Sequence, residues 1–349
     1  MARLRLARGI RLRFLLGLLL GAGLFELLVG WDLLIRAVVR MLRFVRHGIL
    51  LVDWSPDSAG SRAARNGLTR DPRLGHAHVR RREETRIVAS IDGLYNFRDT
   101  GGMPLTGGGA TRSDVLFRSD ALAALTPAGL DALTDTDIGV VVDFRTPGER
   151  QTAPDRLPSS RAFRVVELSI LEGAMAEMAG RFVGSGAALN PGLIAQAMAA
   201  LPTLSELYIG MLQHGAAAFA EVARLIAAST DDEPTAVLVH CTAGKDRTGV
   251  AVALMLDAVG ADRAAVIADY AASQDNLAGP WADGMLQMIT AFGLPLTPEV
   301  RALVTGTPPE AIAAALEWTD AQFGGAGGYL ESGGLTGDEL AALRARLRA

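Results

Sequence analysis

Residues 240–249 concentrate the side chains of this chain that are best suited to chemistry, in the order His-Cys-Thr-Ala-Gly-Lys-Asp-Arg-Thr-Gly. Cys241 stands near the start of this stretch, and Arg247 follows it by six positions. A cysteine beside cations and a helix N-terminus reacts as a thiolate, the form that attacks electrophiles. The planar guanidinium group of an arginine matches two oxygens of a phosphoryl group. The pair therefore predicts a nucleophile and an anion-binding group that act at one point.

The segments on either side predict how these residues are positioned. Residues 235–239 form a short apolar run after Pro234, which predicts a buried strand. Residues 250–259 form an apolar run of helical length that ends at Gly260. A loop that joins the end of a strand to the start of a helix directs unpaired backbone N–H groups at one point and can bind an anion there. The residues expected to bind phosphate in this loop are Thr242, Ala243, Gly244, Lys245 and Thr248.

Composition supports a functional role for two of these residues. Cys241 is the only cysteine, and Lys245 is the only lysine among 34 lysines and arginines. A compact ammonium group in this loop supplies a second cation for an anion. No glycine stands five positions before Gly244, which excludes a nucleotide-binding P-loop. The alternative to a functional site is a buried cysteine in a strand–helix turn with an unrelated arginine nearby.

This stretch resembles the active-site loop of the cysteine phosphatases, Cys-x5-Arg. Its Ala-Gly-Lys-Asp-Arg core is most similar to the bacterial tyrosine and lipid phosphatases typified by the mycobacterial secreted phosphatase B. The resemblance covers the chain from about residue 86 to its end, and three upstream segments carry it as well. These segments are residues 96–102, residues 116–120, and the group Asp143-Phe144-Arg145 with Glu149. The resemblance implies a phosphatase fold with a helical lid over the site.

The residues of the loop predict hydrolysis of a phosphate monoester in two steps. Cys241 attacks phosphorus, while the loop amides and Arg247 stabilise the equatorial oxygens, and water then hydrolyses the phosphocysteine. A proton must reach the leaving oxygen, and two carboxyl groups are candidates for the acid. Asp246 lies within the loop and is favoured, and Asp143 leaves a neighbouring strand. We expect no cofactor and no metal, because the sequence shows no cluster of metal ligands.

A Phe-Arg pair occurs three times near predicted strand ends, at residues 97–98, 117–118 and 144–145. These arginines could surround the site and add positive charge to an acidic domain, with Arg98 and Arg145 as candidate phosphate ligands. Alternatively, each could pair with the acidic residue next to it. Those acidic residues are Asp99, Asp120 and Asp143.

Strand and helix patterns alternate along the chain and predict an α/β fold with a mostly parallel central sheet flanked by helices. Further strands are expected at residues 87–89, 115–117, 138–142 and 165–166, and helices at 128–133 and 204–228. Residues 96–102 are expected to form a loop, and Thr336 to begin a terminal helix. The segments 173–200 and 277–306 are rich in Ala, Met, Gly and Leu, and are candidates for the lid.

The N-terminal part differs from the rest in charge and hydropathy. Residues 1–83 hold 16 arginines against 6 acidic residues, whereas the remainder holds 18 cations against 32 acidic residues. Residues 14–35 are apolar apart from Glu26 and Asp32, which is long enough to span a bilayer, and a basic amphipathic stretch follows. We expect residues 1–54 to be a helical segment on an anionic membrane surface, residues 55–84 a flexible linker, and residues 85–349 the catalytic domain, facing the cytoplasm.

The substrate class remains open between phosphotyrosine, phosphoserine and a phosphoinositide, with phosphotyrosine in protein favoured. Lys245 and the basic N-terminal segment are the features that favour a phosphoinositide. No feature predicts a nucleic-acid partner. Two alternatives to a phosphatase are a rhodanese-like sulfurtransferase, which also uses a cysteine loop, and a non-catalytic phosphate-binding module tethered to a membrane.

Overall fold

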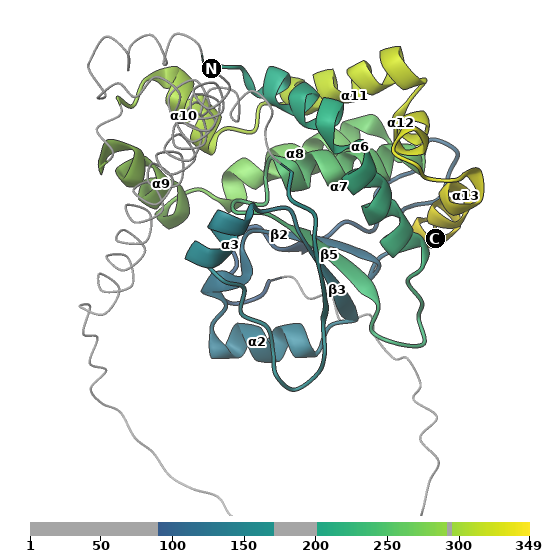
Figure 1. Cartoon of the computed structure of the whole chain (residues 1–349), viewed down its shortest axis with the longest axis horizontal. Coiled ribbons are helices and arrows are strands. Elements are labelled where there is room, and N and C mark those ends of the chain that lie inside the picture. The colour runs from purple at the N-terminus through teal and green to yellow at the C-terminus, as the bar shows by residue number, and fades with distance from the viewer. Residues whose placement is uncertain (1–89, 171–200, 292–294) are drawn as a thin grey trace, which may run out of the picture.

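The computed structural model describes residues 90–170, 201–291 and 295–349, in which a five-stranded sheet is covered by helices on both faces (Figure 1). The strands lie in the order β1-β2-β5-β3-β4, and only β1 runs antiparallel to its neighbour. Their bounds are β1 Arg98–Asp99, β2 Leu116–Ser119, β3 Ile138–Asp143, β4 Arg164–Glu167 and β5 Ala236–His240. The expected mostly parallel α/β fold is confirmed.

The central strand β5 forms because its residues are apolar on both faces, as is typical of a parallel strand covered by helices. Val237 and Val239 pack into the larger core cluster, and Leu238 packs into the smaller one on the opposite face. Residues Ser119 and Asp143 lie beside His240 in the two neighbouring strands. The carboxyl ends of three parallel strands therefore meet where the Cys241 loop begins.

Two groups of helices cover the sheet (Figure 1). The larger core cluster packs helices α6, α7, α8 and α11 to α13 against one face, and α2 packs against the other. Three further helices, α3, α9 and α10, complete the set in the described residues. The bounds are α2 Pro127–Thr134, α3 Pro147–Thr152, α6 Leu204–Ala227, α7 Arg247–Ala258, α8 Arg263–Asn276, α9 Pro280–Ala291, α10 Pro298–Thr305, α11 Pro309–Phe323, α12 Ala326–Ser332 and α13 Gly337–Leu347.

Threonine precedes half of the ten described α-helices, and Thr297 before α10 is one of these threonines. Thr126, Thr146, Thr203 and Thr336 each accept a hydrogen bond from the backbone amide three positions on. A side-chain oxygen at this position satisfies a donor that the first turn of a helix leaves unpaired. The expected helices at residues 128–133, after Thr336 and before β5 are confirmed.

The region expected to be a loop at residues 96–102 contains the short strand β1, so that expectation was wrong in this detail. β1 forms because Arg98 and Asp99 pair with Arg118 and Phe117 of β2. The expected strand at residues 87–89, the lid candidate 173–200, and the segments 1–54 and 55–84 lie outside the described residues. Within the described ranges, no helix has both the length and the apolar character needed to cross a bilayer.

Candidate active site

Cys241 lies at the bottom of the loop that connects β5 to α7, and only 2% of its surface is exposed. The backbone N–H of Gly244 donates to its sulfur over 3.3 Å. This turn requires glycine, because Gly244 has φ +69° and a Cβ atom there would lie 2.3 Å from the carbonyl oxygen of Ser119. A backbone donor in the loop before α7 stabilises negative charge on the sulfur.

Backbone carbonyl groups of the loop are held by side chains and amides behind it. Asn96 Nδ2 donates to the carbonyl of Ala243 over 3.1 Å, and Arg118 Nη2 donates to that of Gly244 over 2.8 Å. The amide of Ala121 donates to the carbonyl of Thr242 over 3.1 Å. These contacts satisfy the carbonyls on the outer side of the loop, which leaves its amides for an anion on the inner side.

Arg118 and Arg98 share one buried carboxylate behind the loop. Arg118 is fully buried and lies 2.5 Å from Asp269 Oδ2, and Arg98 Nε lies 2.6 Å from Oδ1. Burial and the charge of Arg118 lower the pKa of Arg98 to about 10. Burial alone would raise the pKa of Asp269, but the two arginines outweigh it and lower that pKa. The structure thus places Arg98 in a network with α8, and neither arginine pairs with Asp99 or Asp120.

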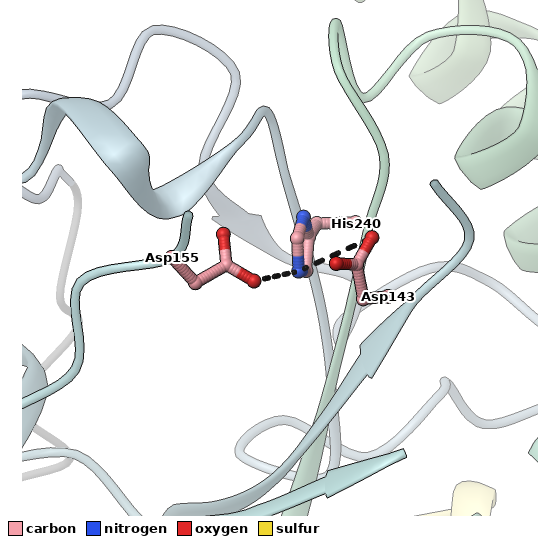
Figure 2. Close-up of side chains that lie close together, drawn as sticks. All are labelled: Asp143, Asp155 and His240. Carbon is pink, nitrogen blue, oxygen red and sulfur yellow. Dashed lines mark ion pairs between the residues drawn. The ribbon is translucent and has the colours of Figure 1, made fainter. Parts of the chain in front are cut away.

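Arg145 pairs with Asp143, which is the alternative that the sequence offered to a role in phosphate binding. Its Nε and Nη2 lie 2.9 and 2.8 Å from the two oxygens of Asp143, and Nη2 also lies 2.8 Å from Asp155. Figure 2 shows His240 beside the same two carboxylates, with Nε2 at 3.2 Å from Asp155 and 3.9 Å from Asp143. These three side chains are close enough to hold a metal ion. The guanidinium group of Arg145 already supplies a cation to both carboxylates.

Arg247 is held by a carboxylate of α3. Its Nη2 and Nη1 lie 2.8 and 2.9 Å from the two oxygens of Glu149, and Thr242 Oγ1 donates to the same carboxylate over 2.6 Å. Burial would raise the pKa of Glu149, but the hydrogen bonds and charge of Arg247 lower it to about 2. Glu149 also accepts from the backbone amide of Thr146, which begins α3. One carboxylate therefore fixes the helix start and the arginine together.

Asp246 and Lys245 contact the helices above the loop. Tyr208 of α6 donates to Asp246 Oδ1 over 2.7 Å, and Lys245 Nζ donates to the same oxygen over 3.0 Å. The ammonium group of Lys245 is buried and also donates to the carbonyls of Leu303 and Gly306 over 2.9 and 3.1 Å. These carbonyls lie at the end of α10. Lys245 therefore ties α10 to the loop by satisfying carbonyls that the helix end leaves unpaired.

Thr248 lies in the first turn of α7, and His240 is the last residue of β5, so the two flank the loop. Thr248 Oγ1 is fully buried and has no hydrogen-bond partner within the part of the chain that the structure describes. A hydroxyl group in this position can donate to an anion in the loop. His240 Nδ1 lies 3.2 Å from the carbonyl oxygen of Cys241, which fits a role in orienting the loop.

Residues 89–349 match the family model described as the tyrosine phosphatase family. The chain belongs to the tyrosine phosphatase family. The phosphatase is 31% identical over 245 residues to the tyrosine-protein phosphatase of Nostoc commune. The aligned region covers 68% of this chain and 76% of that protein. It is 32% identical over 270 residues to the triple specificity protein phosphatase PtpB of Mycobacterium tuberculosis. That alignment covers 71% of this chain and 95% of the mycobacterial protein. The resemblance and the enzyme class are confirmed, and the phosphatase is favoured over the sulfurtransferase and the non-catalytic module.

Three side chains of the phosphatase site had no role assigned from the sequence, although Glu149 was named there as part of the family resemblance. Glu149 had a usable local signal, because Thr146 and Glu149 form a capping box only a few residues after β3 ends. Tyr208 and Asp269 had none, because each lies on a long helix whose pattern indicates only that it is a helix. Their roles depend on which helix packs over the loop.

Proposed function

We propose that the phosphatase hydrolyses phosphotyrosine in proteins through a phosphocysteine intermediate. The observation that carries this proposal is the Gly244 N–H donating to Cys241 Sγ at the bottom of a loop that also holds Arg247. The sulfur attacks phosphorus, the S–P bond forms, and the ester P–O bond breaks toward tyrosine. Loop amides and Arg247 stabilise the charge on the three equatorial oxygens. Water then attacks phosphorus and gives a proton to the carboxylate that the acid has become, the S–P bond breaks, and inorganic phosphate leaves the restored thiolate.

Asp246 is the acid that we propose for the leaving oxygen. Its side chain is 19% exposed at the loop, so a substrate oxygen can reach it. Asp143 is fully buried and accepts from the backbone amide, Nε and Nη2 of Arg145, so its oxygens are engaged as the counter-ion of that arginine. Loss of a general acid costs much with a poor leaving group and little with an activated one. Asp246→Asn should therefore reduce turnover of an alkyl phosphate far more than that of a nitrophenyl phosphate, and Asp143→Asn should not show this difference.

The covalent mechanism is tested with two variants of the loop. Cys241→Ser should abolish turnover of an aryl phosphate and keep affinity for vanadate, because the amides and Arg247 remain. Arg247→Ala should lose both turnover and vanadate affinity. If Cys241→Ser retains turnover within about tenfold of the wild type, the phosphocysteine route is wrong, since a nucleophile contributes far more than that.

A phosphoinositide is the second substrate that we propose, because Lys245 supplies an ammonium group two positions before Arg247 in the sequence of the loop. A compact second cation suits a substrate with more than one phosphate group. This ammonium group has three oxygen partners, on Asp246, Leu303 and Gly306. A second substrate phosphate would replace one of the two carbonyl groups at the end of α10. The name of the mycobacterial relative, a triple specificity protein phosphatase, supports a substrate range wider than one phosphoresidue.

We also propose that residues 1–54 attach the enzyme to anionic membrane on its cytoplasmic side. The support is their apolar run and their excess of arginine. Deleting residues 1–55 should leave turnover of a soluble aryl phosphate unchanged and weaken sedimentation with vesicles that contain phosphatidylserine. Equal sedimentation of the full and shortened proteins would contradict the attachment.

A further inference from the structure

Asp246 occupies the position before the first turn of α7 without capping it. An aspartate at this position usually accepts a hydrogen bond from an amide two or three residues on. The side chain of Asp246 makes no such bond. Its Oδ1 instead accepts from the hydroxyl group of Tyr208 and the ammonium group of Lys245. The carboxyl group is therefore turned away from the helix start and held by groups outside it.

Tyr208 is itself held by a second tyrosine. The hydroxyl oxygens of Tyr208 on α6 and Tyr270 on α8 lie 2.7 Å apart, and their rings meet edge to face with centroids 5.9 Å apart. Because the single hydroxyl proton of Tyr208 goes to Asp246, Tyr270 donates to the oxygen of Tyr208. Burial raises the pKa of both phenols, so both stay protonated near neutral pH. The result is a relay of two buried donors that ends at Asp246.

We propose that Tyr208, supported by Tyr270, is a positioning residue that orients the carboxyl group of Asp246 for proton transfer. This inference rests on the proposed function, in which Asp246 is the acid. Both donors bind Oδ1, and no hydrogen bond from the described residues reaches Oδ2. In this proposal the proton is transferred from Oδ2, the oxygen that these two donors leave open. The Tyr208 ring fills the core between α6 and α8, but packing alone needs no hydroxyl group.

The experiment compares two variants that each remove one buried hydroxyl group. Tyr208→Phe removes the donor to Asp246. Tyr329→Phe is the matched control, because Tyr329 is equally buried and donates to the carbonyl of Leu212 on the same helix α6. For each variant, kcat/KM is measured on an alkyl phosphate and on a nitrophenyl phosphate, and inhibition by inorganic phosphate reports the affinity of the loop.

Tyr208→Phe should lower kcat/KM on the alkyl phosphate by about tenfold and on the nitrophenyl phosphate by less than about twofold, with inhibition by phosphate unchanged. Tyr329→Phe should change the two substrates equally. In an Asp246→Asn background, Tyr208→Phe should add no further loss on the alkyl phosphate, because the group that it orients is gone.

Three outcomes would overturn the role of Tyr208. These are equal losses on both substrates, the same substrate ratio in Tyr329→Phe, and a full additional loss in the Asp246→Asn background. If Asp246→Asn shows the leaving-group effect and Tyr208→Phe does not, the positioning role fails while the proposed acid stands. If Asp246→Asn itself shows no such effect, the proposed acid fails and the role of Tyr208 fails with it. The covalent mechanism is judged separately, by Cys241→Ser.

Discussion

Glu149 binds both terminal nitrogens of Arg247, at 2.8 and 2.9 Å. The same carboxylate accepts a hydrogen bond from the backbone amide of Thr146, the residue that caps the start of α3. A two-point contact between planar groups fixes the guanidinium plane and not only its charge. The position of the Arg247 guanidinium group is therefore set by a residue of α3, whereas the nucleophile Cys241 follows β5. Rigid placement of this kind lowers the cost of organising the site when charge develops in the transition state.

Glu149→Gln should lower kcat/KM by about tenfold or more on phosphotyrosine peptide and aryl phosphate alike, because Arg247 serves every phosphate ester. The neutral amide keeps the size of the side chain and loses the charge-assisted pair. Glu221→Gln is the control, since Glu221 pairs with Arg224 on the surface and should leave kcat/KM unchanged. A value for Glu149→Gln within about twofold of the wild type would contradict the positioning of Arg247 by Glu149.

The ion pair of Glu149 with Arg247 should make the folded state less stable as the pH falls below the ordinary pKa of a glutamate. The pKa of Glu149 falls from 4.5 to about 2 on folding, so its pairing stabilises the fold above 4.5 and this contribution is lost as pH falls toward about 2. The difference in Tm between wild type and Glu149→Gln should be constant from neutral pH down to about 4.5 and shrink below it. If the difference in Tm between wild type and Glu149→Gln grows on acidification, the lowered pKa of Glu149 is contradicted.

Gly244→Ala should damage the loop through both backbone conformation and space. A Cβ atom would lie 2.3 Å from the carbonyl oxygen of Ser119 at a φ of +69°. We expect a loss of unfolding free energy of about 1–3 kcal/mol, together with loss of vanadate affinity. Gly108→Ala is the control, because it has φ +89° and open space around it. Only the strained φ is then added, so vanadate affinity should stay intact; if both variants keep it, the close packing of the loop is not required.

Asp269→Asn should be one of the more destabilising polar changes in the enzyme. It leaves the guanidinium group of Arg118, which is fully buried, without its counter-ion, at a cost of about 3–5 kcal/mol. Because Arg118 also holds the carbonyl of Gly244, phosphate inhibition should weaken at temperatures where the variant is folded. Asp320→Asn removes a partner of Arg263 on the surface and should cost less than about 1 kcal/mol. Chemical denaturation of both variants measures the contrast, and equal costs would refute it.

Lys245→Ala separates the two proposed substrate classes. If the ammonium group binds a second phosphate, turnover of a phosphoinositide should fall several-fold more than turnover of a phosphotyrosine peptide, which has one phosphate group. Assays of both substrates with the same preparation give the ratio directly. Equal losses would show that Lys245 acts only by holding the end of α10, and they would leave phosphotyrosine as the substrate class.

Local sequence was sufficient for the centre of the site. Cys241, Arg247 and the loop amides that would bind an anion all lie within residues 240–249. The strand before them and the helix after them are each predicted by an apolar run in the sequence. Contacts within such a loop follow from backbone geometry, which depends mostly on neighbours along the chain. The parallel sheet also followed, because alternating strand and helix patterns permit few other arrangements.

Partners of charged side chains were decided by tertiary structure. Asp143 and Arg145 stand two positions apart and do pair. Arg98 and Asp99 are adjacent in β1, and successive side chains of a strand point to opposite faces, so Arg98 pairs with Asp269, 171 positions away. Arg247 and Glu149 are 98 positions apart, and Asp246 and Tyr208 are 38 apart. A buried charge or hydroxyl group takes whatever partner the packed helices bring to it, and no local pattern encodes that choice.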